Sequence, residues 1–324
     1  MKAIFGSMNL GKQVFGSDAQ DMVERFLASG RNEIDTAYVY NDGECERLLG
    51  ECLREVPAER YSLATKANPR VTGRMDRDSV FAQLEESLNR LRVDHVDVFY
   101  LHFPDPDTPI AETIEACADL YARGLFRELG VSNFPVSLVE EMGPFCEEYG
   151  CPRPSVFEGV YNALSRKAEE GLFPALDRLG VRFYAYNPLA GGMLTGRYRT
   201  KEDVPEDGRF AVRPNYRNRY WKDSYFQALG LIGSACDAEG IPMAEASLRW
   251  LANHSMLSES RADAVIVGAS RLSQLEQNLR ALEAGPLPPS IIDAFEGAWS
   301  LTSADAPEYY RVNELPIGGA RNGR

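Results

Sequence analysis

Four residues suited to proton transfer stand at, or just after, the ends of short apolar segments. Asp35 ends one segment and Tyr40 follows five residues later; Lys66 ends the next segment and His102 the one after it. A tyrosine phenol has a pKa of about 10 in model peptides, and a neighbouring ammonium favours its ionised form. We therefore expect Lys66 to lower the pKa of Tyr40, and Asp35 to hold the ammonium by an ion pair. With His102 donating a hydrogen bond to a carbonyl oxygen, the set suits carbonyl reduction.

The segments that carry these residues belong to a regular alternation along the chain. Short β-branched or aromatic runs recur, each followed by helical apolar spacing, and this pattern predicts βα units around a parallel sheet. We expect eight strands, at residues 3–6, 32–37, 61–66, 96–103, 127–133, 155–162, 181–188 and 263–269. We expect helices near residues 18–29, 43–54, 79–92, 109–123, 136–149, 168–179, 243–254 and 272–283. Eight such pairs predict a (β/α)8 TIM barrel with reacting groups at the C-terminal ends of its strands.

The competing fold is a doubly wound sheet, which usually has a Gly-rich turn directly after its first strand. No GxGxxG pattern occurs near residues 6–12. Segment 189–222 departs from the alternation because it has little periodicity and is too long for an ordinary βα connection. It carries eight basic and four acidic residues. We therefore expect a long loop after the seventh strand that meets an anionic ligand, the alternative being a solvated mobile loop.

Composition limits the classes of protein and partner. The 324 residues are 44% hydrophobic, as in a globular protein with a large core, and we expect a single domain over 1–324 with a loosely ordered tail at 312–324. The net charge of −13 disfavours nucleic acid and anionic membrane as partners. The six cysteines lack CxxC or His-paired spacing, so we expect buried thiols and no metal site. No secretory or membrane-spanning segment is evident, and the expected location is cytoplasmic.

The motifs around the four residues resemble those of the aldo-keto reductase superfamily. They are DTAYVY at 35–40, ATK at 64–66, DVFYLH at 97–102 and GVSNF at 130–134. YNPLAGGMLTGRY at 186–198, YRNRYWK at 216–222, LRW at 248–250 and VIVGASRLSQLEQN at 265–278 resemble the aflatoxin aldehyde reductase branch. The resemblance covers nearly the whole chain. It implies the barrel fold and a catalytic tetrad of Asp35, Tyr40, Lys66 and His102.

The same resemblance implies a nicotinamide cofactor and its contacts. Ser132 and Asn133 are expected to bind the carboxamide, Tyr186 to stack on the ring, and the backbone of 189–191 to approach the pyrophosphate. The remaining implied contacts are Met8, Asp35, Asn187, Pro188, Leu189, Ala190, Gly191, Arg197, Arg209, Gly268, Ser270, Gln274, Gln277 and Asn278. Arg271 adds a positive charge near the adenosine 2′-phosphate site, which favours NADPH over NADH.

One cofactor position departs from the branch. Where a glutamine usually contacts the carboxamide, this chain has Glu158. A carboxylate can accept from the amide NH2 but cannot donate to the carbonyl unless it is protonated. The orientation of the carboxamide and the affinity for the cofactor therefore depend on the state of Glu158.

Arginines are the candidate contacts of the substrate, beside Tyr40 and His102 at its carbonyl. The branch resembles reductases that accept carboxylate-bearing aldehydes such as succinic semialdehyde, and guanidinium groups match carboxylates well. Arg217, Arg219 and Arg311 are the arginines expected there, although the chain runs 13 residues beyond Arg311. The alternative is that they bind cofactor phosphate or face solvent.

Three functions follow from these residues. The leading one is NADPH-dependent reduction of aldehydes, carboxylate-bearing or dicarbonyl, to alcohols, with the proton from Tyr40. A Schiff-base lyase or aldolase acting through Lys66 is a second, and the ion pair with Asp35 argues against it by keeping the amine charged. The third is a nicotinamide-binding sensor subunit similar to the voltage-gated potassium channel beta subunits. By analogy with the branch, we expect a homodimer.

Overall fold

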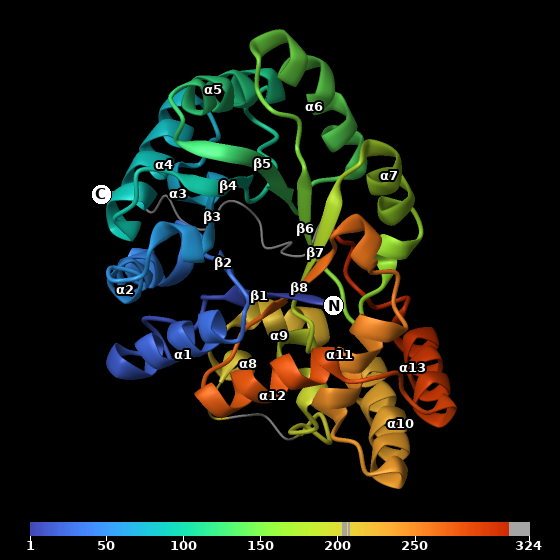
Figure 1. Cartoon of the computed structure of the whole chain (residues 1–324). Helices are drawn as coiled ribbons and strands as arrows, with labels where there is room; N and C mark the ends of the chain where they lie inside the picture. Colours follow the sequence, from blue (N-terminus) through green and yellow to red (C-terminus); the bar gives the residue numbers. More distant parts are fainter. Residues whose placement is uncertain (203–205, 207, 311–324) are drawn as a thin grey trace, which may run out of the picture.

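A computed structural model describes residues 1–202, 206 and 208–310. Its eight parallel strands close into a barrel in sequence order, from β1 to β8 and back to β1 (Figure 1). The strands are β1 Lys2–Gly6, β2 Glu33–Asp35, β3 Ser62–Ala67, β4 Val96–Leu101, β5 Phe126–Ser132, β6 Val156–Val160, β7 Arg182–Tyr186 and β8 Ala264–Val267. Every predicted strand is present, and the predicted (β/α)8 fold is confirmed.

The predicted helices are also present and lie outside the strands (Figure 1). They are α1 Gly16–Ala28, α2 Glu44–Cys52, α4 Arg77–Leu91, α5 Ile110–Ala122, α6 Val136–Tyr149, α7 Leu172–Leu179, α11 Met243–Asn253 and α12 Leu272–Glu283. At the start of α4 the side chain of Asp76 accepts a hydrogen bond from the backbone of Ser79, which caps the helix.

The structure contains further helices that the periodicity did not predict. They are α3 Pro69–Thr72, α8 Arg209–Val212, α9 Pro214–Tyr220, α10 Asp223–Glu239 and α13 Pro289–Thr302, with 3-10 turns η1 Tyr40–Gly43, η2 Ala58–Arg60, η3 Lys167–Glu169, η4 Ala190–Thr195 and η5 Glu259–Arg261. Segment 189–222, expected as a long loop after the seventh strand, contains the 3-10 turn η4 and the short helices α8 and α9. Tertiary packing holds such short helices, since isolated helices of this length are unstable.

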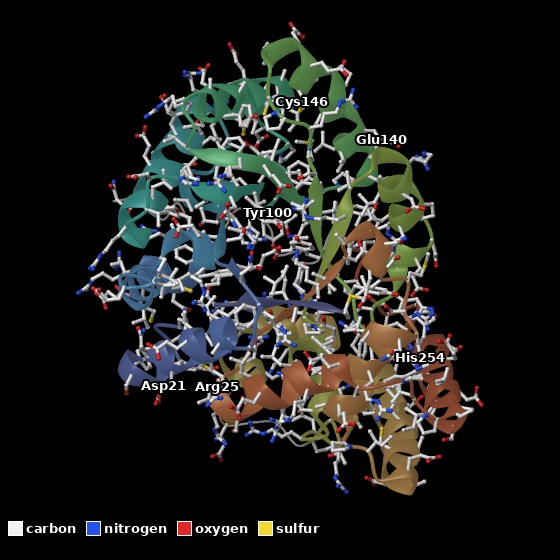
Figure 2. The ribbon with its side chains drawn as sticks, viewed as in Figure 1. Asp21, Arg25, Tyr100, Glu140, Cys146 and His254 are labelled. Atoms are coloured by element: carbon white, nitrogen blue, oxygen red, sulfur yellow. The ribbon has the colours of Figure 1, made fainter. Side chains whose placement is uncertain are left out.

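Side chains of the strands alternate between two apolar layers. Ile4, Val98, Tyr100 and Ile266 form a small cluster with residues of other strands. Figure 2 shows Tyr100 within the ring of strands. The intervening strand residues belong to a larger cluster with the helices. Because all the strands are parallel, their C-terminal ends meet at one mouth.

Three further features bear on function. No helix in the described ranges is both long and apolar enough to span a bilayer. All six cysteines are buried, as expected. Across the same described ranges, no group of three or more His, Cys, Asp or Glu side chains is placed to hold a metal ion.

Candidate active site

Lys66 lies at the centre of the site, near the end of β3, with none of its side chain exposed. Its ammonium forms an ion pair with Asp35 on β2 and donates a hydrogen bond to Thr36 O at 2.8 Å. A second carboxylate lies on its other side, with Glu158 Oε2 3.1 Å from Nζ. Burial alone would lower the pKa of Lys66, but the two carboxylates more than offset it, and the pKa is raised. The amine therefore stays charged, which disfavours a Schiff-base role.

Glu158 reaches Lys66 from β6, across the interior of the barrel. This contact was not predicted, because the sequence indicated only a role beside the cofactor. Glu158 and Asp35 are 3% and 4% exposed. Burial first, and then the charge of Asp35, raises the pKa of Glu158 to about 8.

Tyr40 lies in η1, just after β2, at the edge of the same cluster. The Lys66 ammonium is 5.6 Å from the centre of the phenol ring, and the His102 ring centre is 6.0 Å away. Burial, followed by the charges of Asp35 and Glu158, raises the pKa of Tyr40 well above its usual value. The expected lowering by Lys66 is therefore wrong, because burial, the first of these causes, disfavours the charged phenolate. Tyr40 keeps its proton, as a general acid must.

His102 is held in one tautomer by Asn68, a residue that the sequence did not single out. Asn68 Oδ1 accepts from the backbone N–H of Arg70 at 2.9 Å, which leaves its Nδ2 facing His102 Nδ1 at 3.1 Å. Since an amide NH2 group only donates, Nδ1 accepts and the ring proton lies on Nε2. Burial, Lys66 and Arg70 hold the pKa of His102 well below its usual value. The neutral ring can therefore donate from Nε2.

The ends of β5 and β7 supply a connected polar group beside the tetrad. Asn133 Nδ2 donates to His102 O at 3.0 Å and to Ser132 Oγ at 2.9 Å, while its Oδ1 accepts from Tyr186 Oη at 2.6 Å. Both ends of the Asn133 amide are thus engaged within the protein. The Ser132 hydroxyl and the face of Tyr186 remain the groups of this cluster best placed to meet a ligand.

Backbone conformations at this mouth are unusual in the way that binding loops often are. Asn133, Asn187 and Ala190 have positive φ angles of 61°, 56° and 48°, a region that costs energy for residues other than glycine. Gly191, at φ 69°, could not carry a Cβ, which would lie 2.6 Å from the ring of Tyr216. Among described residues, Asn187 Nδ2 is buried without a hydrogen-bond partner. These features fit a loop built to approach a ligand closely.

The comparisons with known proteins agree with this geometry. A sequence model described as "Aldo/keto reductase family" matches residues 2–300. The chain belongs to the aldo/keto reductase family. It is therefore an oxidoreductase, and its resemblance to the aflatoxin aldehyde reductase branch is confirmed.

Relatives of this reductase cover most of its length. "Aflatoxin B1 aldehyde reductase member 2" of Rattus norvegicus is 44% identical over 319 residues, covering 95% of this chain and 87% of the relative. "Aldo-keto reductase family 7 member A3" of Homo sapiens is 43% identical over 319 residues, covering 95% and 96%. "Oxidoreductase sirO" of Leptosphaeria maculans is 34% identical over 328 residues, covering 94% and 96%.

In this reductase Arg197 and Arg209, two of the predicted cofactor contacts, lie in the segment after β7. The Arg209 guanidinium is 5.0 Å from the centre of the Tyr216 ring, whereas Arg197 is exposed and stacks on Tyr198 at 5.6 Å. The buried Tyr216 hydroxyl donates to Asn187 Oδ1 at 3.3 Å. Although burial raises the pKa of Tyr216, Arg209 and neighbouring arginines lower it overall. Tyr216 is a mouth residue that sequence reasoning missed, although it begins the YRNRYWK motif.

Two cations face Arg209 and were also missed. The pKa of Lys12, in the segment after β1, is lowered chiefly by the charge of Arg213, then by burial and by Arg209. Cations two hundred residues apart in the reductase chain therefore lie near one another, and repulsion of this kind is relieved by a bound anion.

Other predicted cofactor residues lie after β1, after β8 and in α12. Met8 follows β1, and its carbonyl accepts from Asn41 Nδ2 at 2.9 Å. Gly268 follows β8, and the side chain of Gln274 accepts from the backbone and hydroxyl of Ser270 at 3.1 and 3.0 Å. Arg271 stands immediately before α12 and is exposed, while Gln277 and Asn278 lie further along that helix.

The predicted substrate arginines have different outcomes. Arg219 is buried on α9, between the rings of Tyr216 and Tyr220 at 5.1 and 5.5 Å, and its charge acts on Tyr186 at the mouth. In the described residues, no contact connects Arg217 with the tetrad. Arg311 lies outside the described residues. The structure thus brings Arg219 to the mouth.

A cavity of about 940 Å³ lies beside Phe103, the residue after His102, and its lining contains no tetrad residue. Its walls are largely apolar, with Met75, Leu101, Phe103, Phe134, Leu138 and Tyr310 among the lining residues, and Arg70 at one side. Arg70 stacks on Phe103 at 4.4 Å, and Phe103 stacks on His102 at 5.0 Å. The sequence signal for this cavity was available, because Phe103 and Phe134 directly follow His102 and Asn133.

Proposed function

We propose that this aldo/keto reductase reduces aldehydes to alcohols with NADPH, and that Tyr40 supplies the proton. The observation that carries the proposal is the cluster of a protonated phenol, a neutral imidazole and a charged ammonium at one mouth of the barrel. The relatives whose printed names describe aldehyde reductases support the same reaction.

Each tetrad residue has a separate role in this reaction. Tyr40 Oη and His102 Nε2–H both donate toward the carbonyl oxygen, which gains negative charge as the reaction proceeds. Lys66 provides a fixed positive charge beside the phenol, favouring the phenolate that remains after proton transfer. Asp35 holds Lys66 in place through the buried ion pair.

The cofactor supplies the hydride when bound, and the residues present fit it. Ser132, Glu158 and Tyr186 would contact the nicotinamide, and Asn187 offers its unpartnered Nδ2. Lys12, Arg209 and Arg213 form a cationic group suited to a pyrophosphate. Ser270 and Arg271 before α12, with Gln274, Gln277 and Asn278 within it, would hold the adenosine and its 2′-phosphate near the start of that helix.

The substrate is proposed to be an aldehyde with an apolar or aromatic body and a carboxylate. The apolar cavity beside Phe103 suits the body. Arg70 and Arg219 act on each other electrostatically, so both guanidinium groups lie near the mouth, where one carboxylate could bind between them.

The test is loss of NADPH absorbance with succinic semialdehyde and with an aromatic carboxy-aldehyde. Tyr40→Phe removes the acid, and we expect kcat to fall by about 100-fold or more, with NADPH binding retained. Tyr38→Phe is the matched control, because Tyr38 donates to Glu86 away from the site, and we expect full activity. Tight NADPH binding without turnover on a broad aldehyde panel would instead support the sensor-subunit function.

A further inference from the structure

The buried centre of the site contains more carboxyl groups than cations. Asp35 and Glu158 both contact Lys66, and no other described cation forms an ion pair with either. If all three groups were ionised, a net charge of −1 would be buried among residues that are at most 4% exposed. Burying an uncompensated charge is costly, and the usual resolution is that one group keeps a proton.

The surroundings of Glu158 offer nothing else to balance that charge. Tyr100 of β4, Tyr186 of β7 and Tyr40 each have pKa values raised in part by Glu158, so neutral phenols face it. His102 is neutral as well. Lys66 Nζ donates a hydrogen bond to Asp35, whereas its 3.1 Å contact with Glu158 Oε2 lacks hydrogen-bond geometry, and Oε2 accepts no other hydrogen bond within the described residues. Glu158 is therefore the carboxyl that retains the proton more readily.

Building on the proposed use of NADPH, we propose that Glu158 is a neutral carboxylic acid in the resting enzyme and donates a hydrogen bond to the nicotinamide carboxamide. Ionisation of Glu158 then shifts the preference of the site from reduced to oxidised cofactor. A carboxylic acid carries one O–H donor and one carbonyl acceptor, as an amide carries N–H and C=O. Glu158 thus replaces a glutamine without losing the donor.

The direction of the effect follows from charge. Below the raised pKa of about 8, Glu158 is neutral and suits the uncharged reduced ring. Above it, Glu158 is negative and attracts the positively charged oxidised ring. By linkage, oxidised cofactor must then lower the pKa of Glu158 and release a proton on binding.

The experiment measures dissociation constants of NADPH and NADP+ by tryptophan fluorescence from about pH 6 to about pH 9, on either side of the raised pKa. The ratio of the two constants cancels the titration of the 2′-phosphate, which both forms carry. We expect the ratio Kd(NADPH)/Kd(NADP+) to rise by about tenfold in the natural protein, as a pKa difference of one unit would give.

Two variants separate Glu158 from other carboxyls. Glu158→Gln should hold the ratio constant within about twofold, whereas Glu128→Gln, which removes a carboxylate paired with Arg182 at the other end of the barrel, should follow the natural protein. A pH-independent ratio in the natural protein would overturn the inference by itself, even if Glu158→Gln fails to fold. So would an unchanged rise in Glu158→Gln.

Infrared spectroscopy gives a readout without cofactor. At about pH 7, below the raised pKa, the natural protein should show a protonated-carboxyl band that is absent from Glu158→Gln and present in Glu128→Gln. Its absence from the natural protein would overturn the inference. Failure to bind either nucleotide would overturn the proposed function and this inference together, whereas binding with a constant ratio would overturn this inference alone.

Discussion

Proton positions at single residues decide what this site can do. The sequence indicated the four tetrad residues and their chemistry, because each follows a strand in a recognisable motif. It could not indicate that Glu158 would cross the barrel to Lys66, since that contact depends on strand closure. The expected lowering of the Tyr40 pKa failed because burial, which the sequence does not report, is the first cause that raises it. Side-chain types are readable from sequence, whereas the local balance of buried charge is not.

Asn68 provides a prediction at this scale. Asn68→Asp replaces the NH2 donor with a carboxylate oxygen, which would accept a hydrogen bond from an Nδ1–H of His102 and so favour the tautomer without a proton on Nε2. We expect kcat to fall by about 10- to 100-fold with little change in KM. Nitrogen NMR of His102, one of three histidines, reports the tautomer directly.

The matched control for Asn68 is Asn253→Asp. Asn253 donates to the carbonyls of Arg249 and Ala284 at the far end of α11. We therefore expect the Asn253→Asp variant to keep the kcat of the natural protein. Natural kcat in Asn68→Asp, or an unchanged tautomer, would contradict a positioning role for Asn68.

At the scale of elements, the strands were predictable and some helices were not. Strands of a closed parallel sheet are apolar on both faces, so their sequence runs stand out. Helix α10 carries Gly230 and Gly233, which weaken a helix by local preference, and α13 follows Pro288. The two helices pack closely, since a Cβ on Gly297 would lie 2.8 Å from Leu231. Their stability comes from this pairing, which no local pattern shows.

Strand β5 carries a glycine that the site requires. Gly130 lies beside Tyr100 of β4 in the sheet, and a Cβ there would be 2.4 Å from the Tyr100 ring. That ring in turn lies 5.1 Å from the Lys66 ammonium. Gly130→Ala should therefore lower the free energy of unfolding by about 1–3 kcal/mol, as overpacking does, measured by urea denaturation.

Gly230→Ala tests the same chemical change with the opposite expected sign. Gly230 lies inside α10, where an added Cβ meets nothing within 4 Å. We therefore expect Gly230→Ala to raise the free energy of unfolding by about 0.5–1 kcal/mol. Equal effects of the two substitutions would show that crowding against Tyr100 is not what excludes a side chain at Gly130.

For the whole molecule, the question is how a protein of net charge −13 attracts an anionic cofactor. The Debye length is about 8 Å at physiological ionic strength, so distant acidic residues are screened while nearby cations are not. Barrel closure places Lys12, from the start of the chain, near Arg209 and Arg213, two hundred residues later. Position rather than net charge should then govern binding.

Two lysine substitutions that change the net charge equally, but at different ends of the barrel, separate the effect of position from the effect of net charge. Lys12→Gln removes a cation at the C-terminal mouth, and we expect NADPH affinity to fall by about two- to fivefold, the equivalent of a surface ion pair, with a weaker dependence on salt. Lys2→Gln removes a cation at the opposite end of the barrel, where Lys2 pairs with Glu33, and should leave affinity and salt dependence unchanged. Titrations with NADPH over a range of salt concentrations measure both. An equal loss of affinity in the two variants would mean that net charge dominates, because only a long-range field acts alike on both ends of the barrel.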